Sequence, residues 1–323
     1  MLDGPYFDDL HVGHVLAPAP AITIGPGETA LYQAICGDPL AIASSRPLAE
    51  AVTGEPGQVV NPGLVLQVSI GQSTVATRRV IANLFYRGVR LHRTVRVGDT
   101  LSTTVEVRGM RENRRRPDRP PRGSVLLGIR TTDQEGRVVV DYERCPMLDL
   151  RSVDETGHDD DLGGPDSELD LAAWVASAPH WDLGPLPAGE PWMVGQARRD
   201  PLRDTVSDAL ALVRLTQNQA AAHRDPARGL GGQRLVYGGH TIGLAQASLS
   251  RLLPSMATVL GWVSCDHTGP VFEGDVLGCE ARLEGVHPAP SGVVMGLSVR
   301  VEAEREGTTH PVLDWRPVVL ARA

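Results

Sequence analysis

His223 is the side chain with the clearest capacity for proton transfer, and a glycine-rich approach to a helix follows it. Residues 211–253 read ALVRLTQNQAAAHRDPARGLGGQRLVYGGHTIGLAQASLSRLL, in which Gly238 and Gly239 precede a run of small residues. An imidazole gains and loses a proton near neutral pH. A Gly-Gly step into a helix presents free backbone N–H groups and a positive dipole end. Such donors suit a thioester carbonyl that gains negative charge during reaction. We therefore expect His223 to act as acid or base and the two glycines to supply oxyanion donors.

Other polar residues extend this set. Asn218 can hydrogen-bond a water molecule but cannot take its proton. Asp38 is either an acid/base partner or an ordinary member of a Gly-Asp-Pro turn. Tyr237 and His240 flank the Gly-Gly step and either contact substrate or pack. His267, before the Pro-Val start of a strand, either lines a tunnel or satisfies a strand-end carbonyl. His223 itself has a structural alternative, in which its ring caps the neighbouring loop.

The elements that position these residues occur twice in the chain. In each half, small-residue helical spacing, opened by Asn-Pro-Gly at 61–63 and by Gly-Gly at 238–239, precedes segments of alternating polarity. Gly239 follows Gly63 by 176 residues, the turn residue Asp275 follows Asp99 by 176, and Asp314 follows Asp141 by 173. The nearly constant offset predicts a duplicated α+β unit, in which antiparallel strands wrap a central helix. Residues 64–81 are predicted to form the first such helix, and 88–97 a strand.

Composition divides the chain into three parts. Residues 151–170 are acidic, rich in glycine and almost without apolar side chains, which is typical of a linker. Three tryptophans between 171 and 200 indicate a bridge that docks on the second half. We predict an N-terminal domain at 1–150, a linker at 151–185 and a C-terminal domain at 186–323.

Bulk properties exclude several classes of protein. The 323 residues include 31 Lys and Arg against 39 Asp and Glu, a formal charge of −8, which argues against nucleic-acid binding. No apolar run approaches the ~20 residues of a membrane span. Four separated cysteines without C-x-x-C spacing indicate reduced thiols, so we expect a cytoplasmic protein. The histidines show no metal-ligand spacing, so no metal or separate cofactor is expected. The arginine-rich residues 111–122 are expected to form a solvated loop rather than a site for coenzyme A phosphates.

The order of these motifs resembles the MaoC-like hydratase/dehydratase branch of the hot-dog fold, here as a tandem. This resemblance implies a double hot-dog, with two antiparallel sheets that each wrap a long central helix. The motif of that family runs roughly T-G-D-x-N-P-L-H-x-D. In the second half it falls on 216–225, where His223 and Asp225 match and Asn218 replaces the aspartate. In the first half it falls on 36–43, where Asp38 matches and Ala43 replaces the histidine.

The resemblance implies hydration or dehydration at the α,β double bond of an enoyl-CoA thioester, in the manner of (R)-specific enoyl-CoA hydratases. Coenzyme A enters as part of the substrate, Asp225 is a substrate-side residue of the motif, and a homodimer is possible. Three arrangements stay open: His223 acts with Asn218, His223 meets Asp38 across the two halves, or the site binds without reacting. Tyr-Gly-Gly-His at 237–240 also resembles the helix start of double hot-dog thioesterases, so an acyl-CoA thioesterase is the alternative enzyme.

Overall fold

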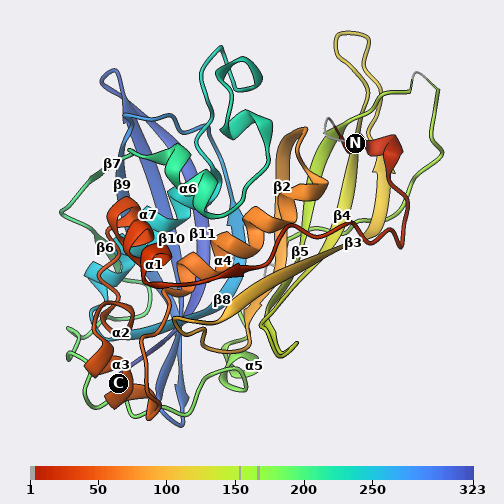
Figure 1. The fold of residues 1–323 in the computed structure, drawn as a ribbon. Coiled ribbons are helices and arrows are strands. Elements are labelled where there is room, and N and C mark those ends of the chain that lie inside the picture. Colours follow the sequence, from red (N-terminus) through yellow and green to blue (C-terminus); the bar gives the residue numbers. More distant parts are fainter. Residues whose placement is uncertain (1–3, 153, 166–167) are drawn as a thin grey trace.

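The computed structural model describes residues 4–152, 154–165 and 168–323, and its first half is a curved sheet packed on one buried helix (Figure 1). Short elements come first along the chain. They are η1 (Phe7–Asp9), β1 (Ile22–Thr23), α1 (Pro26–Cys36), α2 (Ala41–Ser44) and α3 (Arg46–Thr53). The buried helix α4 (Pro62–Gln72) and the 3-10 turn η2 (Ser73–Ala76) follow. The strands are β2 (Val80–Leu91), β3 (Thr100–Glu112), β4 (Arg122–Thr132) and β5 (Val138–Asp149).

The second half repeats this plan around a longer helix. Its main helix is α7 (Gly238–Leu252), and its strands are β8 (Met256–Asp266), β9 (Val276–Ala289), β10 (Gly292–Arg305) and β11 (Thr308–Ala321). Before α7 come α5 (Leu171–Val175), β6 (Ala197–Arg199), β7 (Asp204–Thr205), α6 (Ala209–Leu215), η3 (Ala221–His223) and η4 (Pro226–Arg228).

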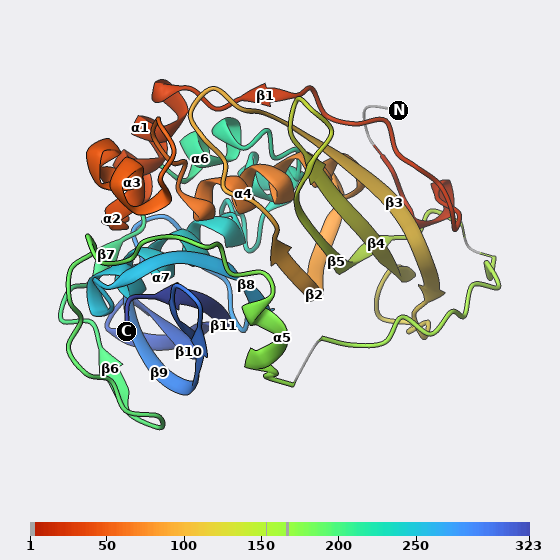
Figure 2. The same cartoon turned by 90° about the horizontal axis from the view of Figure 1, so that it is seen from below.

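The two halves share one continuous sheet. Within the described residues, eleven strands follow the order β1-β3-β4-β5-β2-β8-β11-β10-β9-β6, with β7 also paired to β9. The junction is a short antiparallel contact between β2 and β8, where Val89 faces Trp262 and Arg90 faces Gly261. Helices α4 and α7 contact each other, and Figure 2 shows them side by side, each beside the strands of its own half. Any cavity between the two helices and the β2–β8 junction is therefore built from both halves.

The duplication extends to the starting positions of the elements. Helices α4 and α7 begin at 62 and 238, β2 and β8 at 80 and 256, and β3 and β9 at 100 and 276, an interval of 176 in each case. The later strands differ slightly, because β4 and β10 begin at 122 and 292, an interval of 170. The repeat and the α+β double hot-dog class predicted from sequence are thus present.

Two predicted elements have different bounds. The helix expected over 64–81 ends at Gln72, because the hydroxyls of Ser73 and Thr74 bond back to the carbonyls of Ile70 and Gly71 and tighten the chain into η2. The strand expected over 88–97 ends at Leu91, the last residue of β2.

The segment between the halves lies against the sheet through a few apolar side chains. Leu162, Leu171, Trp174 and Leu183 are buried. The Trp174 ring lies 3.9 Å from the guanidinium carbon of Arg90, next to the β2–β8 junction. The predicted boundaries of the domains and of the linker remain a prediction. Among the described residues, no helix is long and apolar enough to cross a membrane.

Candidate active site

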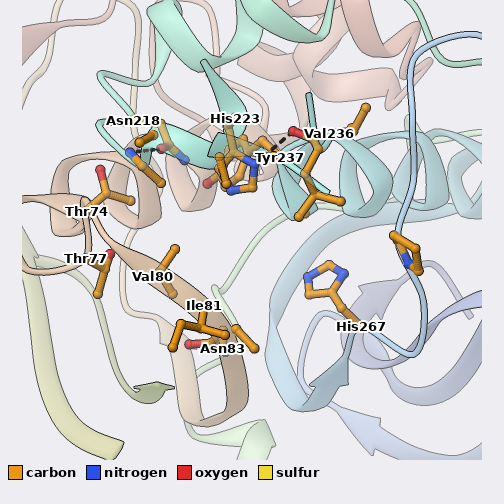
Figure 3. A pocket seen from close by; sticks show the side chains of 18 of the residues that line it. Thr74, Thr77, Val80, Ile81, Asn83, Asn218, His223, Val236, Tyr237 and His267 are labelled. Atoms are coloured by element: carbon orange, nitrogen blue, oxygen red, sulfur yellow. Dashed lines mark hydrogen bonds between the residues drawn. The ribbon is translucent and has the colours of Figure 1, made fainter. Parts of the chain in front are cut away.

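A cavity of about 760 Å³ lies between the two halves, and both contribute to its walls. The first half supplies the end of α4 with η2, the start of β2 and Arg144 of β5. The second half supplies residues 220–223 with Asn218, the approach to α7, and residues 267–271 after β8. Figure 3 shows His223 and Tyr237 together on one side, with His267 entering from the opposite wall. The motif residues of the second half therefore meet residues that the first half provides.

His223 has one ring nitrogen engaged and one available. Its Nδ1 lies 3.0 Å from the carbonyl oxygen of Leu235. A carbonyl only accepts, so Nδ1 carries the proton and Nε2 keeps its lone pair. Burial lowers the pKa of His223 to about 4, against the opposing effect of that hydrogen bond, and the positive charge of Arg234 lowers it further. The imidazole is consequently neutral at pH 7, with a basic nitrogen free to accept a proton.

Asn218 presents a hydrogen-bond donor to the same cavity. Its side chain is fully buried, and its Oδ1 accepts from the backbone N–H of Ala220 at 2.9 Å. That bond fixes the amide so that Nδ2 is the remaining group. Nδ2 has no partner among the described residues, although it is buried, and a buried unpaired donor is costly. Because Asn218 lines the cavity, a water or substrate oxygen bound there would satisfy the donor.

The start of α7 offers free backbone amides, whereas the start of α4 does not. The N-cap of α4 is Asn61, whose Oδ1 accepts from the Gly63 N–H at 2.8 Å, and Pro62 has no N–H to offer. The corresponding N-cap of α7 is Tyr237, which makes no side-chain cap. The amides of Gly238 and Gly239 have no acceptor among the described residues. An oxyanion site of this type is thus available in the second half alone of these two helix starts.

His267 is placed in the site by the structure more firmly than by the sequence. It follows the last residue of β8 and lines the cavity. A Cβ built on Gly238 would lie 2.5 Å from His267 Nε2, so the ring packs on the start of α7. Burial lowers the pKa of His267 to about 4, and the nearby charge of His223 when protonated adds to this effect. The expected bond to a strand-end carbonyl is not among those of the described residues, which leaves the ring directed at the cavity.

The remaining predicted site residues are distributed unevenly. Tyr237 lines the cavity, its ring centroid 5.6 Å from that of His223, and its hydroxyl donates to the Gln67 carbonyl at 3.3 Å. Gly239 is buried one residue behind the cavity wall. His240 is fully buried, does not line the cavity, and has both ring nitrogens without partners among the described residues. Asp225 is exposed and caps η4 through the N–H of Ala227 at 2.9 Å. His240 and Asp225 therefore lie outside the cavity that was expected to include them.

The structure does not bring Asp38 and His223 together. Asp38 is fully buried and is absent from the cavity walls. Its Oδ2 accepts from Asn61 Nδ2 at 2.8 Å and from Gln246 Nε2 at 2.6 Å, and its Oδ1 accepts from the Leu40 N–H at 3.0 Å. These donors occupy the carboxylate within the interior of the first half. The composite arrangement suggested by the split motif is consequently replaced by a structural role for Asp38.

A second cavity of about 330 Å³ is the counterpart of the first under the internal repeat. Residues 267–271 line the main cavity, and residues 91–95, an interval of 176 earlier, line the second one. Its walls contain no counterpart of His223, since Ala43 holds that motif position and short helices α2 and α3 occupy the region. Catalytic side chains have thus been kept in one of two equivalent places.

Charged groups around the main cavity have separate locations. Arg78, Arg79 and Arg228 line it, whereas the arginine-rich residues 113–122 border a different, smaller cavity. Among the described residues there is no group of three His, Cys, Asp or Glu side chains placed to hold a metal ion.

Comparison with known proteins agrees with this architecture. No family model matches the chain. A conserved hypothetical protein of Mycobacterium tuberculosis with a double hot-dog fold is 44% identical, with a TM-score of 0.86 over 99% of both chains. A solved structure from Chloroflexus aurantiacus, described as a MaoC-domain dehydratase, is 26% identical, with a TM-score of 0.88 over 100% of this chain and 99% of that one. The chain belongs to the MaoC-like hydratase/dehydratase family with the double hot-dog fold. The resemblance inferred from sequence is confirmed.

Two curated relatives carry enzyme names. The β-methylmalyl-CoA dehydratase of Chloroflexus aurantiacus is 29% identical over 321 residues, which is 95% of this chain and 90% of the relative. The mesaconyl-CoA hydratase of Cereibacter sphaeroides is 29% identical, over 94% of this chain and 90% of the relative. Both names denote hydration chemistry on coenzyme A thioesters, the class expected from the motifs.

Proposed function

We propose that this protein catalyses the reversible addition of water to the α,β double bond of an acyl-CoA thioester, with His223 as the acid/base group. The observation that carries the proposal is a neutral imidazole with a free Nε2, in a cavity that also holds two unpartnered amides at a helix start. The names of the curated relatives support the same class of reaction.

The reaction balances with the groups at hand. His223 Nε2 takes a proton from water as the water oxygen bonds to the β-carbon, and the double-bond electrons move toward the thioester oxygen. The amides of Gly238 and Gly239 stabilise the negative charge on that oxygen. His223 then returns the proton to the α-carbon, so one water molecule has been added. Dehydration is the reverse of these steps.

Asn218 and His267 have complementary roles in this scheme. The Asn218 Nδ2 group donates to the oxygen of the attacking water, whose proton faces His223. His267 lies against Gly238, so its neutral N–H is a further donor near the thioester oxygen. A histidine held neutral can donate a hydrogen bond without carrying charge. The arginines at positions 78, 79 and 228 are suited to the phosphates of coenzyme A.

The stereochemical course is proposed from the family resemblance. We expect hydration to give the (R)-3-hydroxyacyl-CoA, the outcome in the (R)-specific hydratases that the motifs resemble. Chromatographic separation of the product against both enantiomers tests this point independently of the reaction class.

The test of the reaction class is incubation with crotonyl-CoA and a set of branched enoyl-CoAs, followed by mass spectrometry. A gain of one water molecule is expected. Release of free coenzyme A thiol would identify a thioesterase, and binding without any change would identify a silent acyl-CoA-binding protein.

A matched pair of variants tests the role of His223. His223→Ala is expected to lower kcat/KM by about 10²–10⁴-fold, the usual contribution of a positioned general base. The control is His310→Ala, because His310 is exposed on β11 and far in sequence from every wall of the cavity. Equal activity of the two variants would remove His223 from the mechanism.

A further inference from the structure

Arg144 is a buried cation at the wall of the main cavity. It belongs to β5, its exposed fraction is 3%, and it lines the cavity together with Thr77 and Tyr86. Arginine stays protonated in proteins, so burial does not neutralise it. A charge in this position needs either a counter-ion or a set of strong acceptors.

The protein supplies only part of that requirement. Nη2 donates to the Ser73 carbonyl at 3.1 Å and to Thr77 Oγ1 at 2.8 Å, which are neutral acceptors at the end of the α4–η2 segment. Nε is buried and has no partner among the described residues. The guanidinium is therefore anchored through one nitrogen and retains further donors.

The neighbouring titratable groups are tyrosines, and all of them are neutral. Burial raises the pKa of Tyr86, of Tyr142 and of Tyr237 above the ordinary value for tyrosine, and the positive charge of Arg144 opposes that rise in each case. The shared influence of one charge shows that Arg144 lies among these three side chains. None of them brings a negative charge to the guanidinium.

Other buried charges of the chain are treated differently. The buried carboxylates Asp133, Asp200 and Asp275 each form ion pairs with arginines. No ion pair of Arg144 occurs within the described ranges, although it is as deeply buried as those carboxylates. An arginine whose only role was to cap η2 would not need to face a cavity.

We propose that Arg144 binds a carboxylate carried by the acyl group of the substrate, so that the preferred substrate is the coenzyme A monothioester of a short dicarboxylic acid. This inference rests on the proposed function, because it takes the cavity to hold an acyl-CoA. The acyl group is short, since the Arg144 charge reaches Tyr237, whose ring centroid is 5.6 Å from that of His223. One small acyl group thus spans the reacting carbons and the cation.

The first test needs the wild-type protein alone. Two enoyl-CoA substrates of equal shape are compared, one ending in a carboxylate and the other in a carboxamide. We expect kcat/KM to be at least about 30-fold higher for the carboxylate, as for a charge-assisted bond in a desolvated site. A ratio near one, or a preference for the carboxamide, would overturn the proposal. If both substrates and crotonyl-CoA are inert, the proposed function has failed instead.

Variants assign the preference to the residue. Arg144→Gln is expected to bring the carboxylate-to-carboxamide ratio close to one, and Arg144→Lys to retain part of it. Arg300→Gln is the control, because Arg300 lies exposed on β10 outside the cavity. Calorimetric binding of a saturated carboxylate-ended acyl-CoA gives the same comparison without turnover. An undiminished ratio, or undiminished binding, in folded Arg144→Gln would refute the assignment.

Discussion

The acid side of the pH–activity profile is a direct consequence of how His223 is held. Burial lowers the pKa of this imidazole to about 4, so it remains a competent base in acid where an ordinary histidine is already protonated. At pH 5.5, a group of pKa 4 is about 97% neutral, and one of pKa 6.5 about 9% neutral. We therefore expect kcat/KM at pH 5.5 to stay near its pH 7.5 value rather than fall about tenfold.

Stability sets the lower limit of that measurement. Burial also lowers the pKa of His240 and of His267 to about 4, below the ordinary value for the unfolded chain. The unfolded state therefore binds protons first, so stability is fully present above pH 6.5 and is lost as the pH falls toward 4. At pH 5.5 each such histidine costs about 1.4 kcal/mol, and the cost approaches about 3 kcal/mol below pH 4.

The assay is loss of enoyl-thioester absorbance at limiting substrate from pH 5 to pH 9, with circular dichroism at each pH to confirm that the protein is folded. Because kcat/KM reports the free enzyme, the acid limb measures His223 before substrate binds. A limb with a midpoint near 6.5 in folded protein would refute the reasoning. The same limb in His310→Ala as in wild type is the required control.

Three further predictions concern single residues. Asn218→Asp should raise the pKa of His223 and move the acid limb of kcat/KM upward, because a carboxylate favours the imidazolium; an unmoved limb would show that the two side chains do not interact. Gly238→Ala should lower kcat/KM by at least about tenfold, because the new Cβ would lie 2.5 Å from His267 Nε2 while alanine suits a helix; full activity with unchanged melting temperature would contradict this. Asp38→Asn should leave turnover of the folded protein intact but cost about 1–3 kcal/mol in urea unfolding, because an amide donor would face the donors of Asn61 and Gln246; a loss of kcat without loss of stability would restore the composite site.

Much of the fold could be predicted because its signals are local. The Gly-Gly step at 238–239 starts α7, and the Asn-Pro-Gly at 61–63 starts α4, as helix-start chemistry requires. Alternating polarity located the long strands, and the interval of 176 between Gly63 and Gly239 revealed the repeat. His223 was found for the same reason, since a motif of contiguous residues carries it into the cavity wall.

The missing parts of the site depend on contacts between distant residues. Nothing beside His267 in the sequence tells that β8 delivers it onto Gly238, and its counterpart in the first half is Leu91. Arg144 stands within an ordinary alternating strand, and only the packing of β5 against η2 brings it to the cavity. Asp38 shows the opposite error. It matches a catalytic motif, but Gln246 of the other half reaches over to satisfy its carboxylate.

The two helix starts also explain why chemistry is concentrated in one half. An asparagine N-cap stabilises a helix by about 1 kcal/mol relative to an uncapped start, and α4 has this stabilisation through Asn61. Capping consumes an amide that a catalytic site would need. Helix α7 instead begins with Tyr237 and leaves the amides of Gly238 and Gly239 unpaired, at a cost to its own stability. After duplication, one helix start is sufficient for one reaction in a shared cavity. The other is then free to adopt the stabilising cap, and Asp38 becomes a buried acceptor for the donors of that cap and of α7.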